Sequence, residues 1–120
     1  MTNGKEASSA TPEENERKEI ENYQVMQQQL QIIMLQKQQL QMQTDEMNHA
    51  LEELGKSSGT VYRIVGPIVI QSSKDEISKD LQGKREECSS RVELLGKQEE
   101  RLKKNLMELR KTIEQRRKQD

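Results

Sequence analysis

Apolar residues recur along this chain in two long series, separated by a short stretch with a different period. Within each series the steps alternate between three and four residues without interruption. This spacing keeps side chains on one stripe of an α-helix, and over many turns it indicates a coiled coil. The first series is Tyr23, Met26, Leu30, Ile33, Lys37, Leu40, Thr44, Met47, Leu51 and Leu54. The second series is Leu81, Arg85, Cys88, Val92, Leu95, Glu99, Leu102, Leu106, Leu109 and Ile113.

Capping signals set the expected limits of both helices. In Thr11-Pro12-Glu13-Glu14, the threonine suits the N-cap, the proline suits the first helical position, and Glu14 completes a capping box. We predict a first helix over residues 12–54, with Gly55 as the left-handed residue that ends it and a disordered tail over 1–11. Ser73, with Ser72 as the competing cap, predicts a second helix over 73–117 and a tail over 118–120.

Between the helices, residues 60–71 are rich in β-branched side chains and form two short runs joined at Val65-Gly66-Pro67. Gly66 tolerates a positive φ and Pro67 lacks a ladder donor, so the segment predicts a β-hairpin. Alternation places apolar side chains on both faces, and the strand edges leave backbone groups unpaired. We therefore expect hairpins from several chains to join in a closed sheet or barrel. The expected assembly residues are Val61, Tyr62, Ile64, Val65, Gly66, Pro67, Ile68, Val69 and Ile70.

The two series are also related by a fold at the hairpin. Turning the chain back near Gly66 pairs positions whose numbers sum to 132, such as Leu51 with Leu81 and Tyr23 with Leu109. This match favours helices that pair within one chain. The predicted fold class is mainly α: a long antiparallel two-helix coiled coil joined by a single β-hairpin, which assembles into a β-barrel with other subunits.

Composition excludes a compact enzyme core. The chain has 120 residues, 30% of them hydrophobic, with two tyrosines and neither Phe nor Trp. Residues 1–59 carry five basic and ten acidic side chains, whereas residues 60–120 carry fifteen basic and eleven acidic ones. Opposite net charges favour pairing of the two helices, although exposed pairs contribute only about 0.2–1 kcal/mol each.

The reactive side chains form no recognisable catalytic or metal-binding pattern. Cys88 is the single cysteine and lies on the apolar stripe, where a small buried hydrophobe is expected, and His49 is expected at the surface. We expect no enzyme activity and no cofactor. Without a signal-like or membrane-length apolar run, the protein is expected to be soluble and intracellular, with no membrane partner.

The basic block Arg116-Arg117-Lys118 raises the question of nucleic-acid binding. It has neither a reading element nor stacking aromatics, so nucleic acid is an unfavoured partner. A solvated helix end and a docking surface for an acidic chaperonin patch both stay open as interpretations.

The hairpin segment Val61-Tyr62-Arg63-Ile64-Val65-Gly66-Pro67-Ile68-Val69-Ile70 resembles the linker of β-class prefoldin subunits, and the layout of residues 12–117 resembles theirs too. The Gly-Pro pair makes it most similar to the eukaryotic sixth subunit and to archaeal β subunits. The resemblance implies a heterohexamer of two α-class and four β-class subunits, with a β-barrel platform and six helical tentacles. It also implies a cytoplasmic co-chaperone that holds unfolded proteins, such as actin and tubulin, and passes them to the group II chaperonin without ATP.

In such a particle the client-binding tips correspond to both chain ends. The expected client-contact residues are Ile20, Tyr23, Met26, Leu30, Leu106, Met107, Leu109 and Ile113. Apolar residues off the stripe, namely Ile32, Met34 and Leu35, either contact clients or broaden the coiled-coil core. Gly83 and Gly96 mark either close packing or tolerated weak points in the second helix. The alternative function is a coiled-coil scaffold or homodimeric interaction protein, for which an apolar hairpin at the midpoint has no use.

Overall fold

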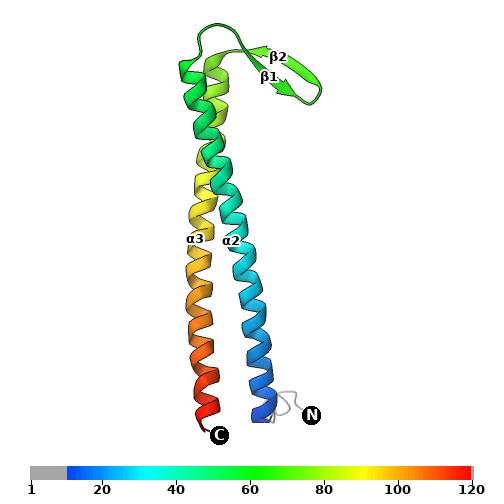
Figure 1. The fold of residues 1–120 in the computed structure, drawn as a ribbon, viewed down its shortest axis with the longest axis vertical. Coiled ribbons are helices and arrows are strands. Elements are labelled where there is room, and N and C mark those ends of the chain that lie inside the picture. The colour runs from blue at the N-terminus through cyan, green and yellow to red at the C-terminus, as the bar shows by residue number, and fades with distance from the viewer. Residues whose placement is uncertain (1–10, 120) are drawn as a thin grey trace, which may run out of the picture. The chain divides into compact units, whose positions relative to one another are not determined.

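The computed structural model describes residues 11–119 and contains two long helices joined by one antiparallel hairpin (Figure 1). Helix α2 spans Pro12–Lys56, strand β1 Val61–Val65, strand β2 Ile68–Ser72 and helix α3 Lys74–Gln119. The predicted arrangement of two helices and a single hairpin is confirmed. The predicted disordered tail lies outside the described residues except for Thr11.

The chain divides into two compact units. Of the described residues, 11–34 and 97–119 belong to the terminal unit and 35–96 to the hairpin unit. In the terminal unit Arg116 contacts Glu19 and Arg117 contacts Glu16. In the hairpin unit Arg85 contacts Asn48 and Cys88 contacts Gln43. Higher numbers in α3 meet lower numbers in α2, so the helices are antiparallel within one chain, close to the predicted register.

The core is a stripe rather than a globular interior. From Glu21 to Lys56, the residues of α2 that are half-buried are the ten positions of the predicted first series, and the other residues are exposed. All ten positions of the second series in α3 are half-buried or buried, with Leu106 and Glu99 the most buried at 9% exposure. We call these positions the seam. Because each helix covers one stripe of the other, the heptad pattern is explained by packing within the chain.

Side-chain caps begin both helices. The Glu14 backbone N–H donates to Thr11 Oγ1 at 3.1 Å, and the Glu76 N–H donates to Ser73 Oγ at 3.1 Å. These bonds satisfy backbone donors that have no partner within the first turn. Ser73 is therefore the cap of α3, which starts at Lys74. The competing residue Ser72 is instead the last residue of β2.

The C-terminal ends of both helices differ from the predicted ones. Helix α2 continues past Leu54 through Gly55, which keeps a negative φ, and the left-handed conformation belongs to Gly59 at φ 104°. The extension is stabilised by Lys74, whose Nζ donates to the carbonyl oxygens of Gly55 and Ser57, both at 3.2 Å. Helix α3 continues to Gln119 rather than 117 because Lys and Gln favour helix.

Strands β1 and β2 pair in register from Val61 opposite Ser72 to Val65 opposite Ile68. The hairpin therefore begins and ends one residue later than the predicted 60–71. Gly66 and Pro67 form a two-residue turn in which Gly66 has φ 58°. Because Pro67 cannot adopt a positive φ, the turn cannot be type I′ and fits type II′, which needs Gly at its first central position.

The two glycines within α3 do not mark close packing. A Cβ atom added at Gly83 or Gly96 would meet no heavy atom within 4 Å. Both glycines are therefore tolerated weak points in a helix that its partner stabilises.

Candidate functional site

The hairpin is the region whose apolar side chains are least covered. Val61 is half-buried. The other large apolar side chains are 48–75% exposed: Tyr62, Ile64, Val65, Ile68, Val69 and Ile70. An isolated two-stranded hairpin is marginally stable in water, and this one has little apolar cover from its own chain.

The two faces of the hairpin are not equivalent. Opposed residues share a face, so Tyr62, Ile64, Val69 and Gln71 lie on one face. The other face, here called the first, carries Val61, Arg63 and Ser72 together with Val65, Ile68 and Ile70, and the last three are 48–58% exposed. The Arg63 guanidinium forms an ion pair with the Asp80 carboxylate of α3, which ties the first face to that helix. The second face has no such tie, and its three apolar side chains are 62%, 75% and 63% exposed.

At the helix ends, most of the predicted client-contact residues lie in the seam. Ile20, Tyr23, Met26, Leu30, Leu109 and Ile113 are half-buried. Leu106 is buried at 9% exposure, whereas its neighbour Met107 is 60% exposed. The structure thus places six of the eight in the seam, all but Ile20 and Met107. Their contact with clients stays a prediction.

Other apolar side chains face away from the seam. Ile32, Met34 and Leu35 are 45–57% exposed, so they do not broaden the core of this chain. Val25, Met42 and Leu94, at 50–57% exposure, belong to the same exposed class and were not anticipated. A sequence signal for two of them exists, since Val25 precedes Ile32 by one heptad and Leu35 precedes Met42 by one heptad.

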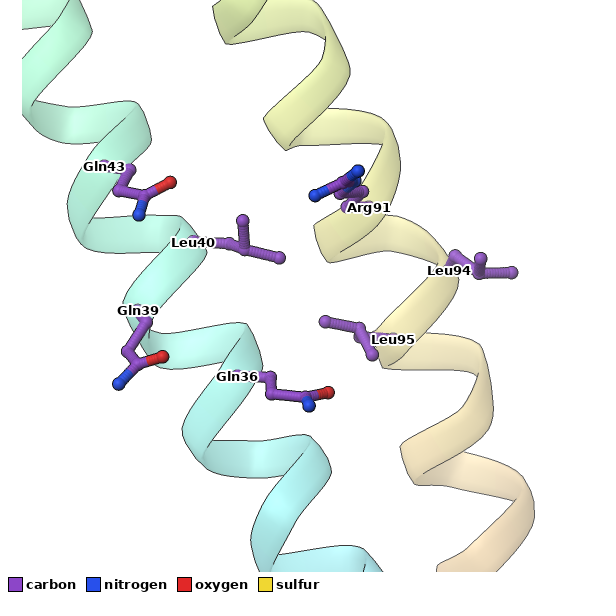
Figure 2. A pocket seen from close by; sticks show the side chains of 7 residues that line it. All are labelled: Gln36, Gln39, Leu40, Gln43, Arg91, Leu94 and Leu95. Atoms are coloured by element: carbon purple, nitrogen blue, oxygen red, sulfur yellow. The ribbon is translucent and has the colours of Figure 1, made fainter.

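A groove of about 370 Å³ opens between α2 and α3 in the hairpin unit (Figure 2). Its walls are three glutamine amides and apolar side chains from α2 and α3, together with one guanidinium. The lining residues are Gln36, Gln39, Leu40, Gln43, Arg91, Leu94 and Leu95. Sequence reasoning did not find this groove, because spacing alone does not show where two helices leave space between them.

The basic block at the end of α3 is partly used within the chain. Arg116 Nη2 lies 2.9 Å from Glu19 Oε1, and Arg117 Nε lies 3.2 Å from Glu16 Oε1. These pairs join α3 to α2 in the terminal unit. The interpretation of the block as a nucleic-acid site loses support, because two of its three cations already face carboxylates.

Within residues 11–119, no helix is both long and apolar enough to cross a membrane. The same residues contain no group of three or more His, Cys, Asp or Glu side chains arranged to hold a metal ion.

Comparison with known proteins identifies the family. The family model described as "Prefoldin subunit" matches residues 17–120. The prefoldin subunit beta of Methanosarcina acetivorans is 38% identical over 81% of this chain and 85% of the relative. The prefoldin subunit beta of Pyrococcus furiosus is 32% identical over 80% of this chain and 81% of the relative. The crystal structure of the prefoldin beta subunit from Thermococcus strain KS-1 has a TM-score of 0.79 at 30% identity, covering 84% of this chain and 90% of that one. The chain therefore belongs to the prefoldin beta subunit family.

Proposed function

We propose that this chain is one subunit of the heterohexameric prefoldin co-chaperone and that it assembles through its hairpin. The observation that carries the proposal is the exposure of the hairpin, whose apolar side chains are mostly more than half accessible. A strand pair with two open edges and apolar faces is stabilised when further strands extend it into a closed barrel. A simple helical scaffold would gain nothing from such a segment.

The inequivalent faces suggest how the hairpin sits in that barrel. The face with Arg63 is tied to α3 through Asp80, so it is expected to lie on the helix side. The face with Tyr62, Ile64 and Val69 is then the one available to fill the barrel interior with apolar side chains. This assignment makes Ile64 and Val69 the most sensitive assembly residues.

The helix ends are proposed to hold unfolded client proteins, actin and tubulin among them, and to deliver them to the group II chaperonin of the cytoplasm without ATP. The exposed side chains of Met107, Ile32 and Met34 in the terminal unit support this role. Methionine is flexible and polarisable, so it adapts to many apolar surfaces. The seam residues at these ends are proposed as further client contacts. Docking to the chaperonin is proposed for the basic end of α3, where an acidic partner would compete with Glu19 and Glu16 for Arg116 and Arg117.

Within the family, we place the chain closest to the eukaryotic sixth subunit. The support is the segment from Val61 to Ile70 with its central Gly66-Pro67 turn, which archaeal β subunits are expected to share. The relatives described above are archaeal β subunits, so reconstitution with eukaryotic partner subunits tests this finer assignment.

Coexpression of the tagged chain with α-class and β-class subunits, followed by native mass spectrometry, tests the assembly. A hexamer containing this chain is expected. A monodisperse monomer, or a homodimer with an exposed hairpin, would contradict the proposal and favour the scaffold.

Truncation tests the role of the helix ends. Removing residues 1–26 and 107–120 should leave the hexamer intact but reduce suppression of light scattering by denatured actin, because the apolar ends are lost. Removing residues 1–10 alone is the matched control and should change neither readout. Full protection and an undiminished transfer to chaperonin by the large truncation would place the client site elsewhere. A partial loss is the expected size of the effect, since the other subunits supply ends of their own.

A further inference from the structure

We propose that the groove between α2 and α3 in the hairpin unit is a binding site for a short extended segment of unfolded polypeptide that pairs an apolar side chain with a carboxylate. The proposal rests on the client-holding function above and adds to it a site outside the helix ends, with a stated ligand chemistry.

The geometry of the groove supplies both apolar and polar contacts. Leu40 of α2 and Leu95 of α3 point toward one another across the groove, and the Arg91 guanidinium is directed toward α2 (Figure 2). A volume of about 370 Å³ lies within the usual range of roughly 300–1,000 Å³ for sites that bind small ligands. It suits a few extended residues, whereas a helix about 10 Å across is too broad.

Of the four polar side chains that line the groove, Gln43 already accepts a hydrogen bond from Cys88 and the other three are available. Among the described residues, Gln36 and Gln39 have no hydrogen-bond partner, and Arg91 has neither a hydrogen bond nor an ion pair. A glutamine amide both donates and accepts, so it can bond to the N–H and C=O groups of any extended backbone. This explains how the site could bind many sequences rather than one.

Charge selects the occupant. Arg91 is the one charged side chain lining the groove, and a guanidinium binds a carboxylate through two parallel N–H donors. The favoured segment therefore carries Asp or Glu beside Leu, Ile or a similar residue. The chain's own residues 1–10 fit poorly, because Met1 is their one large apolar residue and Glu6 lies five positions away.

Peptide binding tests the site in the full-length chain, alone and in the assembled particle. The probe is a fluorescent Gly/Ser peptide with two Leu-Glu pairs, compared with one in which Lys replaces Glu. The variant Arg91→Glu should lower the affinity for the acidic peptide about fivefold and raise the affinity for the basic one. The reason is that the attraction between residue 91 and the acidic peptide becomes a repulsion. Arg101→Glu, at an exposed position outside the groove, is the matched control and should leave both affinities unchanged.

Site-specific cross-linking locates the peptide independently of the other subunits. A photoreactive residue replacing Gln36, which lines the groove, should cross-link the acidic peptide. The same residue replacing Gln38, which is exposed but does not line it, should not.

Equal binding by wild type and Arg91→Glu, equal cross-linking at both positions, or absence of saturable binding would each overturn the proposal. A lower sedimentation coefficient for Arg91→Glu would also overturn it, because the occupant would then be a second copy of the chain. Light scattering of denatured actin with the same preparations reports on the client-holding function separately. Protection without peptide binding would reject the groove and leave that function standing.

Discussion

The hairpin and the seam are built from the same kinds of side chain, yet the chain covers them very differently. Seam residues in both helices are half-buried or buried, whereas Ile64 and Val69 of the hairpin are 75% and 63% exposed. A helix needs cover for one stripe, and the second helix provides it. A strand pair has two faces and two edges. Here α3 forms an ion pair with one face alone, between Asp80 and Arg63. Apolar residues therefore direct folding in the seam and association in the hairpin.

The largest expected effect comes from placing a charge in the hairpin. Val69→Asp or Ile64→Asp should abolish hexamer formation, because an unpaired carboxylate buried in a sheet costs about 3–5 kcal/mol. Helix content by circular dichroism should be largely retained. Native mass spectrometry and size-exclusion chromatography measure assembly, and Ser58→Asp in the exposed loop between α2 and β1 is the control. Hexamers of normal abundance with Val69→Asp would break the distinction between the two regions.

A neighbouring pair of residues in α3 sharpens the comparison. Leu106→Ala should lower the free energy of unfolding by about 2 kcal/mol, because it removes a side chain that is 9% exposed. Met107→Ala, at a position that is 60% exposed, should change stability by less than about 0.5 kcal/mol and reduce client protection instead. Chemical denaturation and light scattering separate the two effects. Equal destabilisation by both substitutions would mean that the seam is not the core.

Glycine-to-alanine substitutions test how far the stability of a helix depends on packing against the other helix. Gly83→Ala should raise the free energy of unfolding by up to about 1 kcal/mol, since the site is helical, exposed and open around the added Cβ. Gly59→Ala should lower stability, because alanine is strained at a φ of 104°. Thermal melts of the two variants should therefore shift in opposite directions. A lower melting temperature for Gly83→Ala would reveal packing at that site.

The smallest expected effect concerns the ion pair between the hairpin and α3. The Arg63 and Asp80 side chains are 43% and 48% exposed, so their coupling should be about 0.2–1 kcal/mol and should weaken with salt. A double-mutant cycle with Arg63→Gln and Asp80→Asn measures it, and hydrogen exchange of the hairpin amides should accelerate in each single variant. A coupling energy of zero would remove the physical difference between the two faces.

Much of the fold was predictable from the sequence because it depends on local spacing. The period of the seam, the N-cap at Thr11 and the turn at Gly66-Pro67 each follow from a few neighbouring residues. The predicted end of α2 was wrong because the extension of this helix depends on Lys74. This residue lies in a later part of the chain and donates to the carbonyls of Gly55 and Ser57.

The candidate sites were predicted less completely for a related reason. Apolar type alone does not distinguish Leu106, which is buried, from Met107, which is exposed, although the spacing of the second series does. Likewise, that Arg91 and Leu40 line the same groove depends on how two distant segments pack.

The ion pair between Arg117 and Glu16 has a consequence for the order of folding. These residues are 101 positions apart, whereas Arg63 and Asp80 are 17 apart. Closing the longer loop costs more chain entropy, so pairing should begin near the hairpin and proceed residue by residue toward the chain ends. The reverse order governs opening, and the ends should fray at a lower free energy than complete unfolding requires. Fraying uncovers Tyr23 and Leu109, which gives half-buried residues a route to contact a client without unfolding the whole chain.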